Sequence, residues 1–127
     1  MIEMNAEHIG LYSEDPLNLS KWYVDTLGFS VVRTLEKEGR PPIFFLRGES
    51  GLVIEILPTD TPRVNRDLNS PGYSHIGLVV NDFDQASSSL TAQGISLYNV
   101  RKTSNGWTIG YMNDPEGNLL ELVYRPQ

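Results

Sequence analysis

His8-Ile9-Gly10-Leu11 recurs in this sequence as His75-Ile76-Gly77-Leu78, and the step from residue 8 to residue 75 is 67 residues. In each copy an aspartate and then a glycine follow at almost the same spacing. Further along, residues 52–57 and residues 118–123 are similar apolar stretches that each contain one glutamate. Because four separate features recur in the same order, we interpret the chain as two copies of one supersecondary unit.

The first copy carries the signals of a strand, a helix and three more strands. Residues 6–11 predict a short strand. Asp15 has the position of a helix N-cap, since Pro16 follows it at the first helical position, and Gly28 suits the left-handed end of that helix. Three more strands are predicted at residues 29–35, 43–47 and 52–57.

The second copy repeats this order. Residues 73–80 predict a strand, Asp82 and Gln85 have the spacing of a capping box, and Gly94 ends the helix that follows. The predicted fold class is therefore α+β, with the order β-α-β-β-β in each half. The last three strands are predicted at residues 95–100, 107–113 and 119–124.

The length of 127 residues suits a single domain. We expect residues 1–127 to form one domain made of two modules, about residues 5–57 and 72–125. The connecting segment, residues 58–71, contains three prolines and several polar residues, which is typical of a linker.

Charge and composition exclude several classes of protein. The chain has 10 Lys and Arg against 16 Asp and Glu, a net charge of −6, which disfavours binding to nucleic acid and to anionic membranes. It has no Cys, so disulfides, thiolate metal sites and cysteine nucleophiles are excluded. The sequence shows neither a long apolar run nor a secretory signal. We therefore expect a cytoplasmic protein whose partner is a small molecule.

Each half places one histidine and one glutamate on strands that are otherwise apolar. Side chains alternate between the two faces of a strand, so the histidine and the glutamate are predicted on the face away from the aliphatic residues. An ionised carboxylate there needs a partner, and imidazole with carboxylate suits a divalent metal. The repetition of the pair favours a metal site over two structural histidines. The candidate ligands, which would fill four of six octahedral positions, are His8, Glu55, His75 and Glu121.

Two further stretches resemble the motifs of a known family. They are the segment from Trp22-Tyr23 to Leu27-Gly28-Phe29 and the segment Asn113-Asp114-Pro115-Glu116-Gly117-Asn118-Leu119-Leu120-Glu121-Leu122. With the repeated tetrapeptide, they make the whole chain similar to the vicinal oxygen chelate superfamily, which includes glyoxalase I, extradiol dioxygenases and bleomycin-binding proteins. The resemblance implies two tandem βαβββ modules that form a curved mixed sheet around a metal-binding cleft, with the helices on the outer face.

The resemblance also implies a ligand set and a reaction. The superfamily's ligand positions fall on the two histidines and two glutamates named above, a pattern most similar to that of glyoxalase I-like lyases. It implies one divalent metal ion (Ni, Co, Mn, Zn or Fe). It also implies a lyase or isomerase, similar to lactoylglutathione lyase, that acts on a small substrate with vicinal oxygens through a metal-stabilised enediolate or enolate. By analogy, Glu121 is the first candidate for the catalytic base and Glu55 is the second.

Two alternatives stay open at this point. One is a metal-independent drug or metabolite binding protein of the bleomycin-resistance type, and the other is an oxygenase similar to the ring-cleaving dioxygenases. Tyr12 and Thr59 stand where glyoxalase I commonly has Arg and Asn that engage glutathione, so the pattern does not identify glutathione as the substrate. Superfamily members are often homodimers. We therefore expect a homodimer, with the metal site formed within one chain or between two.

Weaker candidates for the substrate cavity come from the remaining strands. Trp107, Ile109 and Tyr111 share one face of a predicted strand and are candidates for the cavity wall. The cations that are candidates for binding an anionic substrate are Arg33, Arg47, Arg101 and Lys102.

Overall fold

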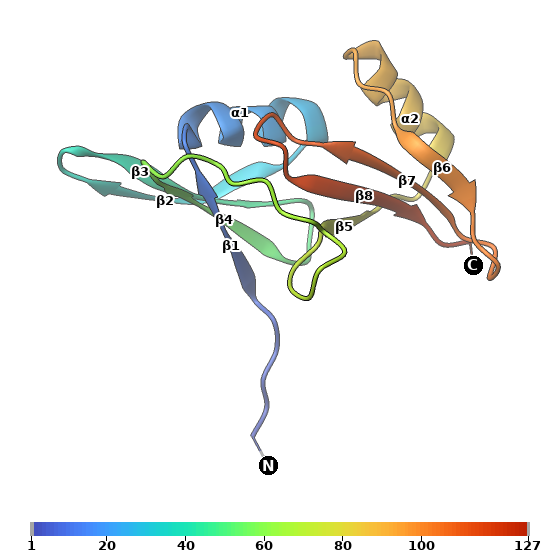
Figure 1. The fold of residues 1–127 in the computed structure, drawn as a ribbon, viewed down its shortest axis with the longest axis horizontal. Coiled ribbons are helices and arrows are strands. Elements are labelled where there is room, and N and C mark those ends of the chain that lie inside the picture. The colour runs from blue at the N-terminus through green and yellow to red at the C-terminus, as the bar shows by residue number, and fades with distance from the viewer. Residues whose placement is uncertain (1, 127) are drawn as a thin grey trace. The chain divides into compact units, whose positions relative to one another are not determined.

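The computed structural model describes residues 2–126. The chain divides into two compact units, Met1–Val64 and Asn65–Gln127 (Figure 1). The division falls inside the proline-containing segment 58–71. Within residues 2–126, no helix is long and apolar enough to cross a membrane.

The first unit is a four-stranded mixed sheet with one helix. Its elements are β1 (His8–Ser13), α1 (Pro16–Leu27), β2 (Ser30–Lys37), β3 (Arg40–Arg47) and β4 (Val53–Pro58). The strands lie in the order β1-β4-β3-β2. The pair β1 and β4 is parallel, and the other neighbours are antiparallel. The first strand therefore lies beside the last strand of the same unit, which brings the two sequence motifs of this half together.

The second unit repeats the arrangement. Its elements are β5 (Ile76–Val79), α2 (Phe83–Ala92), β6 (Tyr98–Lys102), β7 (Thr108–Asn113) and β8 (Leu119–Tyr124). The strand order is β5-β8-β7-β6, with β5 parallel to β8 and the other neighbours antiparallel. The predicted α+β class, with the order β-α-β-β-β in each half, is confirmed.

The predicted start signals of both helices are also confirmed. The Asp15 carboxylate accepts a hydrogen bond from the Asn18 N–H at 3.1 Å, and Gly28 ends α1 with a left-handed φ of 75°. At α2, the Asp82 carboxylate accepts a hydrogen bond from the Gln85 N–H at 3.0 Å. These contacts satisfy backbone donors that the first turn of a helix leaves without an intrahelical partner.

Besides β5, which is described with the candidate site, two strands begin two or three residues later than the sequence predicts. The first, β1, begins at His8 rather than at residue 6, because its partner β4 begins at Val53, which pairs with His8. The second, β6, begins at Tyr98 rather than at residue 95, because the Ile95 N–H bonds instead to the Leu90 carbonyl at the end of α2, at 2.9 Å. Hydrogen-bond partners, which local patterning does not reveal, set both boundaries.

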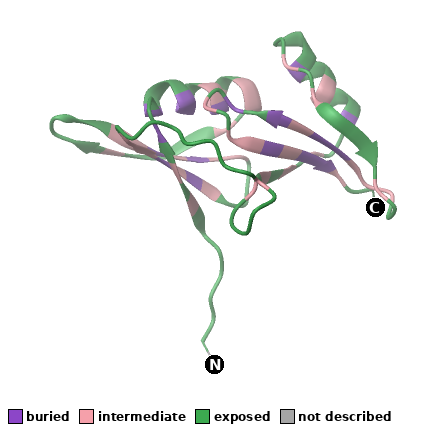
Figure 2. Ribbon diagram, viewed as in Figure 1, coloured by how far each residue is buried: buried purple, intermediate pink, exposed green. Residues whose placement is uncertain are grey.

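Each helix covers one face of its own sheet, and most of the buried residues (purple in Figure 2) belong to the helix and to that face. In the first unit they include Leu19, Tyr23, Phe44, Leu46, Ile54 and Ile56. In the second unit they include Phe83, Leu90, Met112, Leu120 and Leu122. Because neighbouring residues of a strand point to opposite faces, Glu55 and Glu121 lie on the face of each sheet that does not bear the helix.

Candidate metal centre

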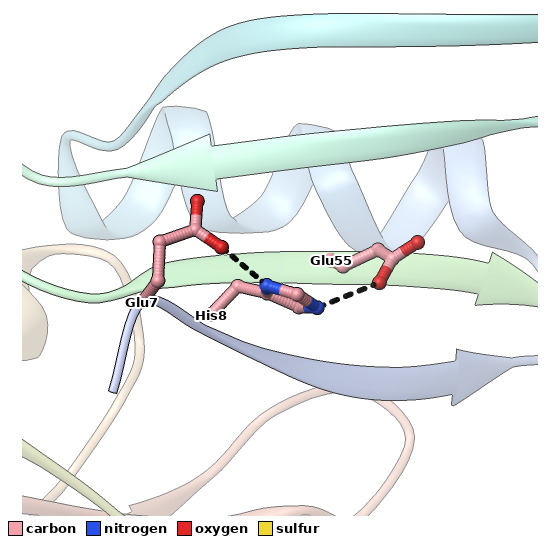
Figure 3. Close-up of polar contacts among 3 residues, drawn as sticks. All are labelled: Glu7, His8 and Glu55. Atoms are coloured by element: carbon pink, nitrogen blue, oxygen red, sulfur yellow. Dashed lines mark hydrogen bonds and ion pairs between the residues drawn. The ribbon is translucent and has the colours of Figure 1, made fainter. Parts of the chain in front are cut away.

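The first His–Glu pair is formed by the parallel strands β1 and β4 (Figure 3). In their register Gly10 lies opposite Glu55, and His8 lies two residues before Gly10 on the same face. The Nε2 atom of His8 is 3.5 Å from Oε1 of Glu55. The His8 side chain is 48% exposed and the Glu55 side chain 19%, so a metal ion or substrate can reach the pair from solvent.

Glu7 contacts the other ring nitrogen of His8. The Glu7 Oε1 atom is 2.5 Å from Nδ1, as Figure 3 shows. This hydrogen bond raises the pKa of His8 above its ordinary value of 6.5. Desolvation opposes the increase, and the negative charges of Glu7 and Glu55 add to it. With a proton held on Nδ1, the neutral ring keeps its lone pair on Nε2. A histidine that binds a metal commonly donates its other N–H to a carboxylate in this way.

The second pair repeats the arrangement beside β5 and β8. Glu121 lies opposite Gly77, and the Nε2 atom of His75 is 3.8 Å from Oε1 of Glu121. The hydroxyl oxygen of Ser74 is 2.9 Å from Nδ1 of His75, in the place that Glu7 takes in the first pair. In both pairs the residue that precedes the histidine therefore contacts Nδ1, and Nε2 faces the glutamate.

His75 does not lie in a strand, contrary to the prediction. Instead of residues 73–80, β5 covers only Ile76–Val79, because it pairs with only four residues of β8. His75 therefore precedes the strand. Besides the Ser74 contact, the ring of Tyr111 lies edge-on to the imidazole, with 6.1 Å between the ring centroids.

The turn between β7 and β8 fixes the position of Glu121. The buried Asp114 carboxylate accepts hydrogen bonds from the N–H groups of Glu116 and Asn118 at 2.9 and 3.0 Å, and from the Asn118 side chain at 2.8 Å. A short polar side chain that satisfies the backbone of its own turn is typical of a tight turn. This turn sets the register in which Tyr111 lies directly opposite Glu121.

Tyr111 is a site residue that the sequence assigned only to the cavity wall. Its hydroxyl donates a hydrogen bond of 3.0 Å to Oε2 of Glu121. The bond leaves Oε1 as the oxygen that faces His75. The sequence does contain a signal for this contact, because both residues lie five positions from residue 116, in the segment between the two predicted strands.

The first unit has Phe45 at the position of Tyr111. Phe45 lies opposite Glu55, but it has no hydroxyl to donate. An arginine lies over each ring. The guanidinium carbon of Arg33 is 5.8 Å from the ring centroid of Phe45, and that of Arg101 is 5.8 Å from the ring centroid of Tyr111. Each glutamate therefore lies opposite an aromatic ring, but only Glu121 receives a hydroxyl hydrogen bond from that ring.

The other cavity candidates are placed as follows. Ile109 is buried, on the sheet face of the candidate ligands. Trp107 precedes β7, and the guanidinium carbon of Arg125 lies 4.4 Å from the centroid of its ring system. Arg47 is the last residue of β3. Lys102 pairs with Thr108 of β7, whose side chain lies on the α2 face.

The four predicted ligands come together as two pairs. His8 lies beside Glu55, and His75 lies beside Glu121, one pair in each unit. Within residues 2–126, no three His, Asp or Glu side chains gather closely enough to form a metal site. Each unit thus supplies two of the four donors that the sequence predicts.

Comparison with known proteins identifies the family. A model of the Glyoxalase/Bleomycin resistance protein/Dioxygenase superfamily matches residues 5–122. The chain belongs to this superfamily. The resemblance inferred from the sequence motifs is therefore confirmed. No curated protein matches the chain.

Solved structures with the superfamily fold cover nearly the whole chain. SMU.1112c is 24% identical with a TM-score of 0.80, over 94% of this chain and 98% of its own. The glyoxalase family protein from Enterococcus faecalis is 23% identical with a TM-score of 0.78, over 94% and 96%. The lactoylglutathione lyase from Agrobacterium tumefaciens is 21% identical with a TM-score of 0.70, over 96% and 94%. At these identities the similarity establishes the fold alone.

The donor set of this superfamily member fits a divalent metal, which the superfamily commonly binds. Two imidazoles and two carboxylates are ligand types that Ni, Co, Mn, Zn and Fe accept. The Glu7 carboxylate accepts from Nδ1 of His8 and so favours the tautomer that such a metal needs, and the Ser74 hydroxyl is placed to accept from Nδ1 of His75 in the same way.

Proposed function

We propose that this protein is a divalent-metal-dependent lyase or isomerase of the glyoxalase type, acting on a small substrate with vicinal oxygens. One metal ion would be shared by two His–Glu pairs. The observation that carries the proposal is the repetition of a single arrangement, in which Nε2 faces a glutamate oxygen and Nδ1 contacts the preceding residue. The proposed ligands are His8, Glu55, His75 and Glu121.

A purely structural role explains the two pairs less well. A solvent-accessible ion pair contributes only about 0–1 kcal/mol to stability, so stability alone does not require the same geometry in both units. Nor does a surface ion pair require that Nδ1 have its own partner, as it has beside both Glu7 and Ser74. A metal ligand has both requirements, because its tautomer and its ring orientation must be fixed.

Proton transfer would be carried out by the chain's own carboxylates. When bound, the metal would supply Lewis-acid stabilisation of the negative charge that develops on the substrate oxygens. We propose Glu121 as the base that takes a proton from the carbon beside a carbonyl and returns it to the neighbouring atom, with Glu55 as the second candidate. The Tyr111 hydrogen bond supports this assignment, because it restricts the rotation of the Glu121 carboxylate.

A metal-independent binding protein for a drug or metabolite is the second candidate function. It is favoured by the aromatic rings on the face of Glu121, where Arg101 lies over Tyr111 and Arg125 lies over Trp107. Rings and cations of this kind can hold a flat anionic molecule without a metal. Under this hypothesis, a chelator leaves ligand binding unchanged.

An iron oxygenase similar to the ring-cleaving dioxygenases is the third candidate. Such enzymes commonly use two histidines and one carboxylate and keep the remaining positions open. The second glutamate makes this candidate the weakest of the three. Oxygen consumption with bound Fe(II), measured with a catechol, would support it.

We also propose a cytoplasmic homodimer, because superfamily members are often dimeric. In such a dimer the two His–Glu pairs of one centre would come from one chain or from two. Light scattering tests the dimer, since a dimer has twice the 14.3 kDa mass of the chain. A monomer in dilute solution that still binds one metal ion would show that both pairs come from one chain.

Metal analysis tests the proposed centre directly. Untagged protein, purified without chelator, is compared with the His75→Ala variant and with Glu38→Gln as a control that removes an exposed carboxylate between β2 and β3. About one equivalent of a transition metal in the wild type and the control, lost in His75→Ala, is the expected result. No metal in the wild type, even after addition of Mn, Co, Ni, Fe and Zn, would overturn the proposal and favour the binding protein. The metal found would then be used in screens of hemithioacetals, acyl-CoA epimers and catechols.

A further inference from the structure

One strand of the second unit contains an extra residue beside the candidate site. Tyr98 of β6 pairs with Tyr111 of β7, whereas Arg101 pairs with Ile109. Three residue steps on β6 thus match two on β7, which defines a β-bulge. Within the bulge, Asn99 has a positive φ of 52°, in the left-handed region that asparagine tolerates better than most residues do.

The bulge changes which side chain faces the candidate ligands. In a regular strand Val100 would share a face with Tyr98, and Arg101 would point the other way. Here Val100 lies on the α2 face, where its Cγ2 atom is 3.0 Å from the position that a Cβ atom would take on Gly110. Arg101 takes the face of Tyr98 instead, and its guanidinium lies over the ring of Tyr111.

The Arg101 guanidinium has donors to spare. Its Nη1 donates one hydrogen bond, of 3.2 Å, to the Asn99 carbonyl, and the side chain is exposed. A guanidinium has five N–H donors in all. Among the residues that the structure describes, no carboxylate forms an ion pair with Arg101, although the chain carries an excess of acidic residues. The bulge therefore presents a cation with free donors, one aromatic ring away from Glu121.

We propose that Arg101 binds a carboxylate on the substrate, so that the substrate class is vicinal-oxygen compounds with a carboxylate beyond the reacting atoms. This inference rests on the proposed metal-dependent function. Two neutral imidazoles, two carboxylates and a divalent ion form a neutral centre, which by itself would not select an anion. Arg101 supplies that selectivity, because a guanidinium matches a carboxylate in a bidentate geometry.

A matched pair of chelating probes tests the proposal. N-hydroxysuccinamic acid and its methyl ester both present the two vicinal oxygens of a hydroxamate, but only the acid carries a distal carboxylate. Their binding to metal-loaded protein is measured by calorimetry. We expect the wild type to bind the acid about 10- to 100-fold more tightly than the ester, the range for one charge-assisted contact.

Three variants assign this preference to a residue. Arg101→Met should bind the acid and the ester equally, and Arg101→Lys should keep part of the preference because it keeps the charge. Lys102→Met is the control, since it removes a cation from the next position of β6, on the α2 face. Lys102→Met should bind both probes as the wild type does.

Each contrary outcome has a distinct meaning. Equal binding of both probes by the wild type, or a preference that survives in Arg101→Met, would overturn the role of Arg101 and leave the metal centre intact. A preference lost in Arg33→Met but kept in Arg101→Met would assign the anion to the first unit and would also overturn the proposal. If neither probe binds to protein incubated with metal, the proposed metal-dependent function fails, and the inference fails with it.

Discussion

The hydroxyl of Tyr111 and the Oε2 atom of Glu121 are joined by a hydrogen bond of 3.0 Å across the β7–β8 hairpin. The corresponding residues of the first unit, Phe45 and Glu55, face each other without one. The two carboxylates thus occupy equivalent places in the repeat but differ in how firmly they are held. This difference supports Glu121 as the oriented base, and it makes the role of Tyr111 testable.

Replacing Tyr111 with Phe should weaken metal binding about tenfold, because Glu121 loses the contact that orients it. Metal affinity is measured by competition with a chromogenic chelator, so the test does not depend on knowing the substrate. Tyr98→Phe is the control, since its hydroxyl donates to Asn113 rather than to a candidate ligand. Equal affinities of Tyr111→Phe and Tyr98→Phe would show that the hydrogen bond does not position a metal ligand.

Replacing Glu121 with Gln should abolish exchange of the substrate proton while leaving the fold intact. An amide keeps the shape of the side chain but cannot accept the proton, and loss of a general base typically costs about 100- to 10,000-fold in rate. Incorporation of deuterium from solvent into a substrate found by screening is the measurement. Glu55→Gln is the comparison. Full activity in Glu121→Gln with loss of activity in Glu55→Gln would transfer the role of base to Glu55.

The contact with Glu7 makes His8 sensitive to pH. The hydrogen bond with Glu7 raises the pKa of His8 above 6.5 in the folded, metal-free protein. The contact therefore stabilises the folded state fully at pH values below the pKa that His8 has in the unfolded chain. This stabilisation is lost as the pH rises through the higher pKa that His8 has in the folded protein. Below the raised pKa a proton also competes with the metal for Nε2, so metal affinity should increase with pH across this range.

Glu7→Gln should lower the pKa of His8 toward 6.5, as followed by NMR titration of the metal-free protein. Glu3→Gln removes a charge from the same N-terminal stretch without a contact to His8 among those described, and it serves as the control. If Glu7→Gln and the wild type titrate alike, the Nδ1 contact is absent in solution. Glu7 would then not fix the tautomer of His8.

Gly110 should not tolerate a side chain. A Cβ atom there would lie 3.0 Å from Cγ2 of Val100 and 3.2 Å from Cζ of Phe83, so Gly110→Ala should destabilise the protein by about 1–3 kcal/mol. Urea unfolding measures this change. Gly48→Ala is the control, because no atom comes closer than 3.9 Å to the added group. Equal stability of the two variants would mean that Val100 moves aside, and that the bulge at Asn99 does not hold it against Gly110.

Much of the molecule could be predicted from the sequence, because the repeat records its architecture. The element order, both helix N-caps and the pairing of each histidine with a glutamate follow from periodicity and spacing. The Asp114 turn follows from its local sequence, because a short polar side chain can satisfy the backbone of its own turn. These features depend on residues that are near each other in sequence, or that recur.

Other features depend on partners distant in the sequence. Whether His75 lies in a strand is decided by how many residues of β8 can pair with β5. Which face Arg101 takes is decided by a single extra residue at Asn99, and strict alternation predicts the opposite face. The spacing of Tyr111 and Glu121 about residue 116 indicates that they can face each other, but only the register of the hairpin establishes their hydrogen bond. Each of these is a matter of register, which residue types alone do not determine.

The exchange of a phenol for a plain phenyl ring between Tyr111 and Phe45 makes the two halves of the repeat chemically unequal. The two units share their strand order and their His–Glu contacts, so the backbone alone does not distinguish one glutamate from the other. Here one carboxylate is tethered by a hydroxyl and the other is not. A single oxygen atom therefore gives the duplicated units the means to divide their roles.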